Sequence, residues 1–293
     1  MENTLKKNII PRIAAIHDMS GFGRCSLSVI IPTLSSMGMQ VCPLPTAVLS
    51  THTGGFEGYT FVDLTDTMKA YYEHWKSLGI TFDCIYTGFL GSTKQIDIIL
   101  DFIKDFAKED TMVVVDPVFA DGGKLYDTFT PDFINHMKRL VSKAQTITPN
   151  ITEASFLLAQ EKKEVYSVDE AKKMLLSLCK LGPQTAVITS MVMPDAANCV
   201  VAYDKIDGRF WRVGCDYIPA EYPGTGDIFT SVLAGALLEG DSLPVAIDRA
   251  VQFISIAIRT TFGYNPPIRE GVVLERVLHT LSKTPENINY EIL

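Results

Sequence analysis

Apolar residues along this chain follow two alternating periods. Short runs rich in β-branched and aromatic residues, typical of buried strands, are separated by longer runs in which apolar residues recur every three or four positions, as on one helix face. The strand-like runs cover residues 12–18, 40–49, 82–90, 111–119, 145–148 and 185–190. The helix-like runs cover residues 25–37, 64–78, 96–107, 131–141 and 168–181. This alternation predicts an α/β fold with a mostly parallel central sheet and helices on both faces.

The pattern changes after residue 190. The remaining runs predict strands over 198–204 and 208–218, and helices over 227–239, 244–262 and 272–281. A tight turn over 205–208 joins the two strands, which indicates an antiparallel hairpin near the C-terminal edge of the sheet. Pro32 argues against a regular first helix, because proline removes a backbone hydrogen bond. Since no linker or repeat interrupts the chain, we expect one domain over residues 1–293.

Charge and cysteine content narrow the kind of partner. A net charge of −8, a pI near 5.2 and the lack of a Lys/Arg cluster disfavour binding to nucleic acid or to anionic membranes. Residues 1–8 lack the apolar core of a signal peptide, and no apolar run approaches the ~20 residues that span a bilayer, so we expect a cytoplasmic protein. Six scattered cysteines without a C-x-x-C pair indicate buried thiols. A small-molecule partner is therefore expected.

Polar side chains gather where the predicted parallel strands end. In an open parallel sheet, ligands bind in the crevice beyond the carboxyl ends of the strands. The residues at or just beyond these ends include Asp18, Thr46, His52, Asp116, Thr148, Asn150, Thr189 and Ser190. Strand ends are also polar simply because turns are, so the pattern alone leaves a binding site and ordinary turns equally open.

The sharpest local signal is the sequence Pro223-Gly224-Thr225-Gly226-Asp227, directly before an apolar helix. Its backbone amides and the helix dipole would form a cavity for a phosphoryl group, and Asp227 could accept a proton from an attacking alcohol. An aspartate that only caps the helix is the alternative. No Walker loop occurs, and residues 21–26 lack the third glycine of a dinucleotide fingerprint, which disfavours a nicotinamide-dependent dehydrogenase.

Two motifs together resemble the ribokinase superfamily. Residues 224–227 are similar to its anion-hole and catalytic-base motif, and Thr148-Pro149-Asn150-Ile151-Thr152-Glu153-Ala154 is similar to its nucleotide and magnesium segment. Residues 45–53, 87–92 and 116–118 resemble the pyridoxal kinase branch in particular. The resemblance implies a ribokinase-like fold and ATP-dependent phosphorylation of the 5'-hydroxymethyl group of a B6 vitamer, in vitamin B6 salvage.

The same resemblance implies a role for each candidate residue. Asp227 would be the general base, with the amides of Gly224, Thr225 and Gly226 as anion hole. The implied substrate contacts are Asp18, Thr46, Phe89 and His52, although His52 fits a polar loop equally well. The implied ATP contacts are Thr148, Asn150, Thr189, Ser190, Asp121 and Tyr126, with Asp116 and Glu153 for Mg²⁺. Residues 120–126 fall where these kinases have a mobile flap. A homodimer is also implied, and K⁺ activation stays open.

Two departures keep other functions open. Many pyridoxal kinases have serine where Asp18 stands, whereas hydroxymethylpyrimidine kinases of thiamine synthesis have aspartate, so a pyrimidine substrate is an alternative. Ala120 replaces the usual flap glycine, which predicts a stiffer loop. A catalytically inactive regulatory protein with this fold is the alternative from another class, and the intact residues 224–227 with Asn150 and Glu153 argue against it.

Overall fold

A ten-stranded sheet runs through the computed structural model, which describes residues 9–215, 218, 220–282 and 290–293. The strands of this sheet are β1 (Arg12–Phe22), β2 (Gln40–Thr51), β3 (Phe61–Asp63), β4 (Cys84–Thr87), β5 (Met112–Val115), β8 (Thr146–Ile147), β9 (Thr185–Met193), β10 (Ala196–Asp204), β11 (Phe210–Gly214) and β12 (Tyr290–Ile292). Their spatial order is β12-β11-β10-β9-β8-β5-β4-β1-β2-β3. Neighbours from β2 to β9 are parallel, and the pairs at both ends are antiparallel. The prediction of a mostly parallel sheet with a hairpin near its C-terminal edge is confirmed.

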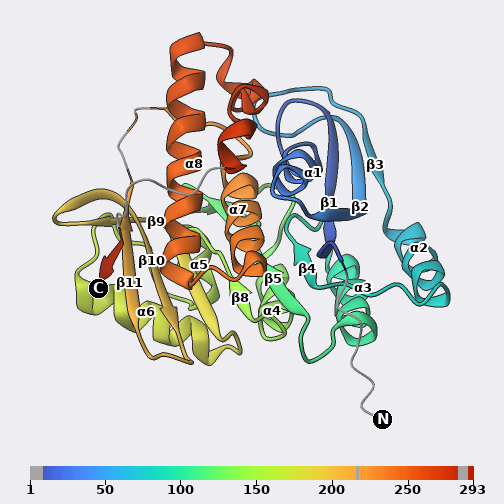
Figure 1. Ribbon diagram of the computed structural model, residues 1–293, viewed down its shortest axis with the longest axis horizontal. Coiled ribbons are helices and arrows are strands. Elements are labelled where there is room, and N and C mark those ends of the chain that lie inside the picture. The colour runs from blue at the N-terminus through green and yellow to red at the C-terminus, as the bar shows by residue number, and fades with distance from the viewer. Residues whose placement is uncertain (1–8, 216–217, 219, 283–289) are drawn as a thin grey trace.

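Helices cover both faces of the sheet (Figure 1). The helices are α1 (Leu27–Ser36), α2 (Thr65–Ser77), α3 (Thr93–Phe106), α4 (Pro131–Val141), α5 (Ile151–Leu157), α6 (Val168–Lys180), α7 (Thr225–Glu239) and α8 (Leu243–Tyr264). One buried apolar cluster joins the sheet to α2–α6, and a second joins it to α1, α7 and α8. Each fully buried large side chain contributes about 1.5–3 kcal/mol to this packing. The two cores make the sheet a rigid platform for residues at its rim.

Several element boundaries differ from the prediction for identifiable reasons. Strand β5 ends at Val115 and not at 119, because Pro117 has no backbone N–H for a strand ladder. β1 and β2 run on to Phe22 and Thr51, and they stay paired with each other up to these residues. α1 continues as a helix through Pro32, up to Ser36.

The C-terminal part of the chain holds one wrong prediction. Instead of a short helix over 272–281, the structure has 3₁₀ turns at Ile268–Glu270, Leu274–Arg276 and Leu278–Ser282. The buried residues here are Val272, Leu274, Val277 and Leu281, and the two-residue step at their start does not fit the stripe of an α-helix. The predicted strand 208–218 is shorter, at Phe210–Gly214, and its residues 216 and 217 lie outside the described residues.

All six cysteines are free thiols. Cys84, Cys179 and Cys199 are buried as predicted, but Cys25, Cys42 and Cys215 are partly exposed. Cys25 lies in the loop before α1, at the rim and not in either core. In the part of the chain that the structure describes, no helix combines the length and apolar character needed to cross a membrane.

Candidate active site

The start of α7 packs tightly against the loop that follows β1. Gly224 has φ 81°, and a Cβ atom there would lie 2.2 Å from the carbonyl oxygen of Arg24. Only glycine fits such a close approach of two backbones. The turn is then held from the helix side, because Ile228 N–H donates to the Gly224 carbonyl at 3.0 Å. The amides of residues 224–227 are thus presented at the N-terminus of a rigid helix, where the dipole favours an anion.

Asp227 lies in the first turn of α7, with its carboxylate turned toward the β1–α1 loop. Its Oδ2 atom accepts a hydrogen bond from Ser26 N–H at 2.8 Å and lies 3.5 Å from Cys25 Sγ. Burial raises the pKa of Asp227 to about 6, with a contribution from the charge of Asp18, while the Ser26 N–H opposes the shift. A carboxylate with this pKa is ionised at neutral pH and is basic enough to accept a proton from an alcohol.

Asp18 lies close to Asp227, within strand β1, where the pairing of β1 with β2 shifts register. It is 5% exposed, and its Oδ1 accepts a hydrogen bond from the Ser26 hydroxyl at 2.6 Å. Burial raises the pKa of Asp18, and hydrogen bonds from Ser26 and Ser20 oppose this. Thr46 of β2 is fully buried and donates to the Phe89 carbonyl at 3.4 Å. Asp18, Asp227 and the loop between them form one side of the candidate site.

His52 and Phe89 are both engaged within the protein. His52 Nε2 lies 2.7 Å from the Arg269 carbonyl oxygen, so this nitrogen carries the proton and donates it. Its Nδ1 accepts from Gly54 N–H at 3.1 Å, which leaves neither ring nitrogen free. The geometry favours the interpretation of His52 as a loop residue. The Phe89 ring packs on Phe129 at 5.7 Å between centroids and is partly exposed.

The polar residues beyond β5 and β8 form the other side of the site. Asp116 is 6% exposed, and its Oδ2 lies 3.4 Å from the hydroxyl of Thr230 on α7, which donates to Thr148 at 3.0 Å. Asn150 and Glu153 form a capping box at the start of α5. The Glu153 carboxylate accepts from Asn150 N–H at 2.9 Å and from Phe119 N–H at 3.2 Å. Backbone amides therefore fix the Glu153 carboxylate beyond the carboxyl ends of β5 and β8.

The predicted flap is a small antiparallel hairpin of β6 (Ala120–Asp121) and β7 (Lys124–Leu125). Gly122 and Gly123 form its turn with φ 56° and 82°, a region that favours glycine. Its base is tied to α5, because Asn150 Nδ2 donates to the Ala120 carbonyl at 2.8 Å and Gly123 N–H donates to Thr152 at 3.0 Å. Tyr126 follows the hairpin. Burial raises the pKa of the Tyr126 hydroxyl, and the negative charge of nearby Glu153 raises it further.

Two further predicted ATP contacts lie on β9, beside the start of α5. Thr189 N–H donates to the Pro149 carbonyl at 3.1 Å, and the Ser190 hydroxyl accepts from Ile151 N–H at 3.4 Å. Residues 18, 116, 148–153 and 224–227 are thus linked around one rim, where sequence reasoning placed them. Sequence reasoning missed Ser26 and Thr230, which join these groups. Ser26 fell inside the helix predicted over residues 25–37, whereas α1 begins at Leu27, so its position before the helix was not visible in the sequence.

Comparison with known proteins identifies the family. The family model described as phosphomethylpyrimidine kinase matches residues 31–270. The chain belongs to this family. It is therefore a kinase.

Solved and curated relatives agree with this assignment. A Bacteroides thetaiotaomicron protein, provisionally named a phosphomethylpyrimidine kinase and crystallised with pyridoxal, is 51% identical, with a TM-score of 0.93, over 97% of this chain and 100% of that one. Pyridoxal kinase from Lactobacillus plantarum is 30% identical, with a TM-score of 0.85, over 92% of this chain and 96% of its own. Arabidopsis thaliana pyridoxal kinase is 28% identical over 264 residues, covering 82% of this chain and 80% of its own.

The carboxylates of Asp116 and Glu153 would fit a Mg²⁺ ion, the cation that commonly accompanies ATP in phosphoryl transfer. Burial raises the pKa of both groups, and their negative neighbours, Asp227 for Asp116 and Asp116 for Glu153, raise it further. A cation would relieve this repulsion. Among the described residues, no group of three or more His, Cys, Asp or Glu side chains could hold a metal by itself. Two carboxylates that share the ion with water and phosphates suit Mg²⁺, which keeps much of its hydration shell.

Mg²⁺ added with ATP should raise the melting temperature at both pH 8 and pH 5.5. We expect this rise to be larger at pH 8, by at least about 2 °C. Carboxylates whose pKa is raised in the folded state stabilise the ligand-free protein at low pH, and this stability is lost as pH rises through the folded values. Mg²⁺ binds only the ionised groups, so its contribution grows with pH. Melting curves with ATP plus Mg²⁺ and with ATP plus a chelator measure the difference. The variant Asp116→Asn should lose most of the Mg²⁺-dependent rise in melting temperature. An equal rise at both pH values would contradict the assignment of Mg²⁺ to these carboxylates.

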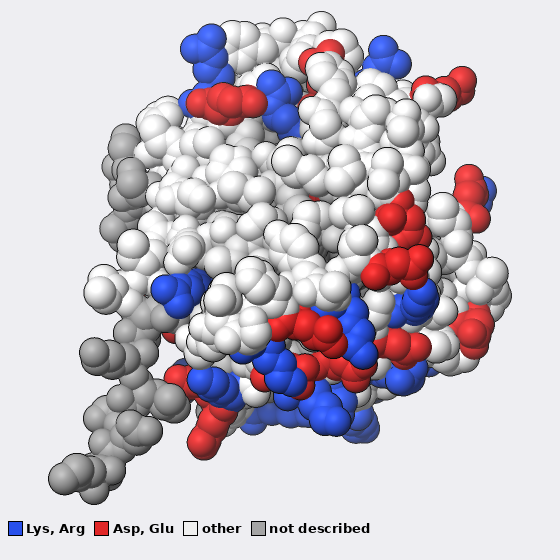
Figure 2. Space-filling view, turned by 90° about the vertical axis from the view of Figure 1, so that its right-hand side faces the viewer, with Lys and Arg blue, Asp and Glu red and all other residues white. Residues whose placement is uncertain are grey.

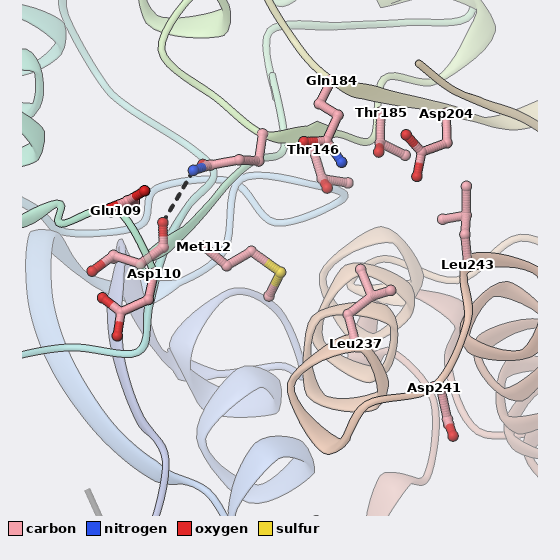
Figure 3. A pocket seen from close by; sticks show the side chains of 12 residues that line it. Glu109, Asp110, Met112, Thr146, Gln184, Thr185, Asp204, Leu237, Asp241 and Leu243 are labelled. Carbon is pink, nitrogen blue, oxygen red and sulfur yellow. Dashed lines mark hydrogen bonds between the residues drawn. The ribbon is translucent and has the colours of Figure 1, made fainter. Parts of the chain in front are cut away.

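A separate cavity of about 400 Å³ opens at the opposite rim of the kinase, at the amino ends of β5, β8 and β9. Figure 3 shows Glu109 and Asp110 on one side of it, with Asp204 and with Leu237 and Leu243 of the α7–α8 region toward the other side. None of the predicted site residues lines it. No glycine among the described residues lines it, and it lies away from the carboxyl ends of the strands, where ligands bind in such sheets.

Proposed function

We propose that this kinase transfers the γ-phosphoryl group of ATP to the hydroxymethyl oxygen of a B6 vitamer. The observation that carries the proposal is the relative solved with pyridoxal, which is 51% identical over nearly the whole of this chain. The site agrees with it chemically. Asp18 offers a buried acceptor for a donor on the ring, and Asp227 offers a base 2.8 Å from the Ser26 N–H that orients it.

The proposed reaction is an in-line attack of the substrate hydroxyl on the γ-phosphorus. Asp227 accepts the hydroxyl proton as the oxygen–phosphorus bond forms and the bond to ADP breaks. The amides of residues 224–227 stabilise the charge on the equatorial phosphoryl oxygens, because they point outward from the start of α7. Asp116 and Glu153 would hold Mg²⁺, which neutralises phosphate charge. Asn150, Thr189 and Ser190, with Asp121 and Tyr126 of the flap region, would bind ATP.

Hydroxymethylpyrimidine is the second candidate substrate, and the family match together with Asp18 favours it. An ADP-release assay with pyridoxal, pyridoxine, pyridoxamine and hydroxymethylpyrimidine decides between the two classes. We expect kcat/KM to be at least about tenfold higher for a B6 vitamer, a difference of about 1.4 kcal/mol in transition-state binding. A higher kcat/KM for the pyrimidine would overturn the proposed substrate, while the kinase assignment would remain.

We also propose that the kinase forms a homodimer through the β3 end of the sheet. β3 is the outer strand on this side, and such an edge presents unpaired backbone groups. Val48 and Val62 face each other across β2 and β3 and are 42% and 49% exposed. Figure 2 shows a broad uncharged area on the face of the molecule on this side, with charged side chains gathered below it.

Val62→Lys should convert the dimer to a monomer, because a buried unpaired ammonium opposes association. Light scattering on the eluted protein should then give the mass of one 32.4 kDa chain. Ile206→Lys is the matched control, since Ile206 is 78% exposed in the turn between β10 and β11, at the other end of the sheet. A monomeric wild-type protein, or the same change in both variants, would refute the proposed interface.

A further inference from the structure

Ser26 occupies a helix-capping position without capping the helix. It stands immediately before α1, where a serine hydroxyl usually accepts a hydrogen bond from the first turn. Here it makes no such bond, and the hydroxyl donates instead to Asp18 Oδ1 at 2.6 Å. The backbone N–H of the same residue donates to Asp227 Oδ2 at 2.8 Å. One residue thus makes a hydrogen bond to each of two neighbouring carboxylates.

The backbone of Ser26 is held in an uncommon conformation. Its φ of 53° and ψ of −134° lie outside the regions that residues with a side chain ordinarily adopt. An isolated antiparallel bridge pairs Ser26 with Met19, next to Asp18. On the other side, Gly224 packs its backbone against Arg24 and Cys25. The strained conformation aims the N–H and the hydroxyl of Ser26 at different carboxylates, which a relaxed helix cap would not do.

We propose that Ser26 is a positioning residue that holds the base Asp227 and the substrate-binding carboxylate Asp18 in register, and that its hydroxyl sets how strongly Asp18 binds the substrate ring. The proposal rests on the proposed function in one respect, that Asp18 binds the substrate. Its geometric content, a hydroxyl that fixes and ionises Asp18, is independent of which alcohol the kinase phosphorylates.

Ser26 makes the main interaction that favours the ionised form of Asp18. The charged or titratable groups that face Asp18 are Asp227, Cys25 and His52. Asp227 is negative and disfavours the ionised form of Asp18, and both ring nitrogens of His52 are occupied by backbone groups. Ser20 is the other hydroxyl donor to Asp18, at the longer distance of 3.4 Å. The 2.6 Å bond from Ser26 is therefore the main interaction that favours a fixed, ionised Asp18.

Ser26→Ala and Ser26→Gly test the proposal, with Ser28→Ala as matched control. Both changes at position 26 remove the hydroxyl and keep the N–H that contacts Asp227, and the glycine also relieves the positive φ. Ser28 stiffens the same loop, through hydrogen bonds to Cys25 N–H and to the carbonyls of Cys25 and Gly23, without touching either carboxylate. The first measurement is the pH titration of the Asp18 carboxyl carbon by NMR, assigned with Asp18→Asn.

We expect the Asp18 midpoint to rise by about one pH unit in Ser26→Ala and Ser26→Gly, and to stay at the wild-type value in Ser28→Ala. With the alcohol that the wild type phosphorylates, KM should rise about tenfold in both position-26 variants. Their kcat at pH 8 should change less than about threefold, because Asp227 keeps its N–H donor.

An unchanged midpoint at position 26, an equal shift in Ser28→Ala, or a loss confined to kcat would each overturn the role of Ser26. If the wild type turned over neither vitamer nor pyrimidine, the proposed function would fail on its own, and the titration would still decide the role of Ser26. If the alanine variant did not fold, the glycine variant gives the same readout without the backbone strain.

Discussion

Replacing Asp227 by asparagine should lower kcat by roughly 10²-fold or more and leave the binding of pyridoxal and ATP nearly unchanged. Asparagine has the shape of aspartate and can still accept from Ser26 N–H, so the turn at the start of α7 should keep its form. It cannot take the proton of the attacking hydroxyl. Steady-state assays give kcat, and melting-temperature shifts with each ligand report binding separately from turnover.

The pH dependence of the same reaction gives a second reading of Asp227. Its pKa of about 6 means that the base is ionised above this pH and protonated below it. We therefore expect kcat/KM of the wild type to fall as pH drops below about 6, and this limb to be lost in Asp227→Asn. A pH profile that is the same in both proteins would remove Asp227 from the proton transfer.

A control is needed for the alternative that Asp227 only stabilises the helix. Asp132 also lies in the first turn of a helix, as the second residue of α4, and its ion-pair partner His136 is not a site residue. Asp132→Asn removes the favourable interaction with a helix dipole, worth about 0.3–1 kcal/mol, and should leave kcat near the wild-type value. The capping interpretation would be correct if the two variants lost similar stability and if Asp227→Asn lowered kcat no more than Asp132→Asn does.

The sequence predicted the fold well where apolar period and turn chemistry agree. The α4 prediction has the boundaries of the structure, because Pro131 begins the helix and the apolar stripe continues to Val141. The hairpin of β10 and β11 followed from its turn residues. β3 and β12 were missed, since three-residue edge strands carry no measurable period and form only when a neighbouring strand presents its edge.

The site was predictable at the level of motifs and not of contacts. Asp18 and Asp116 could be placed at one rim because parallel strands end together, and Asp227 was placed there by its glycine motif. Ser26, which donates to both Asp18 and Asp227, and Thr230 of α7, which lies 3.4 Å from Asp116, show that the three residues meet. The bridging role of Ser26 depends on a positive φ that no side chain of this type predicts. The hydrogen bond of His52 could not be predicted either, because its partner Arg269 is more than two hundred residues away in the chain.

Gly224→Ala should lower kcat by about 10²-fold or more, because the added methyl group cannot be accommodated where it points. It would lie 2.2 Å from the Arg24 carbonyl oxygen and 3.2 Å from the Cys25 Cα atom, both of them backbone. The turn must then move by about 1 Å, and with it the amides that face the phosphoryl group and the carboxylate of Asp227. The positive φ adds a strain of about 1–3 kcal/mol to the folded state.

Gly240→Ala is a control that introduces the strain of an alanine at positive φ without a steric collision of its methyl group. Gly240 ends the same helix with φ 99°, and a methyl group there meets no atom within 4 Å. It should therefore lower the free energy of unfolding by a similar strain while kcat stays within about threefold of the wild type. Chemical unfolding and steady-state kinetics on both variants measure the two effects. An equal loss of kcat in the two would mean that general destabilisation of α7 impairs catalysis. A loss confined to Gly224→Ala would show that the reaction depends on how closely this turn meets the loop carrying Cys25 and Ser26.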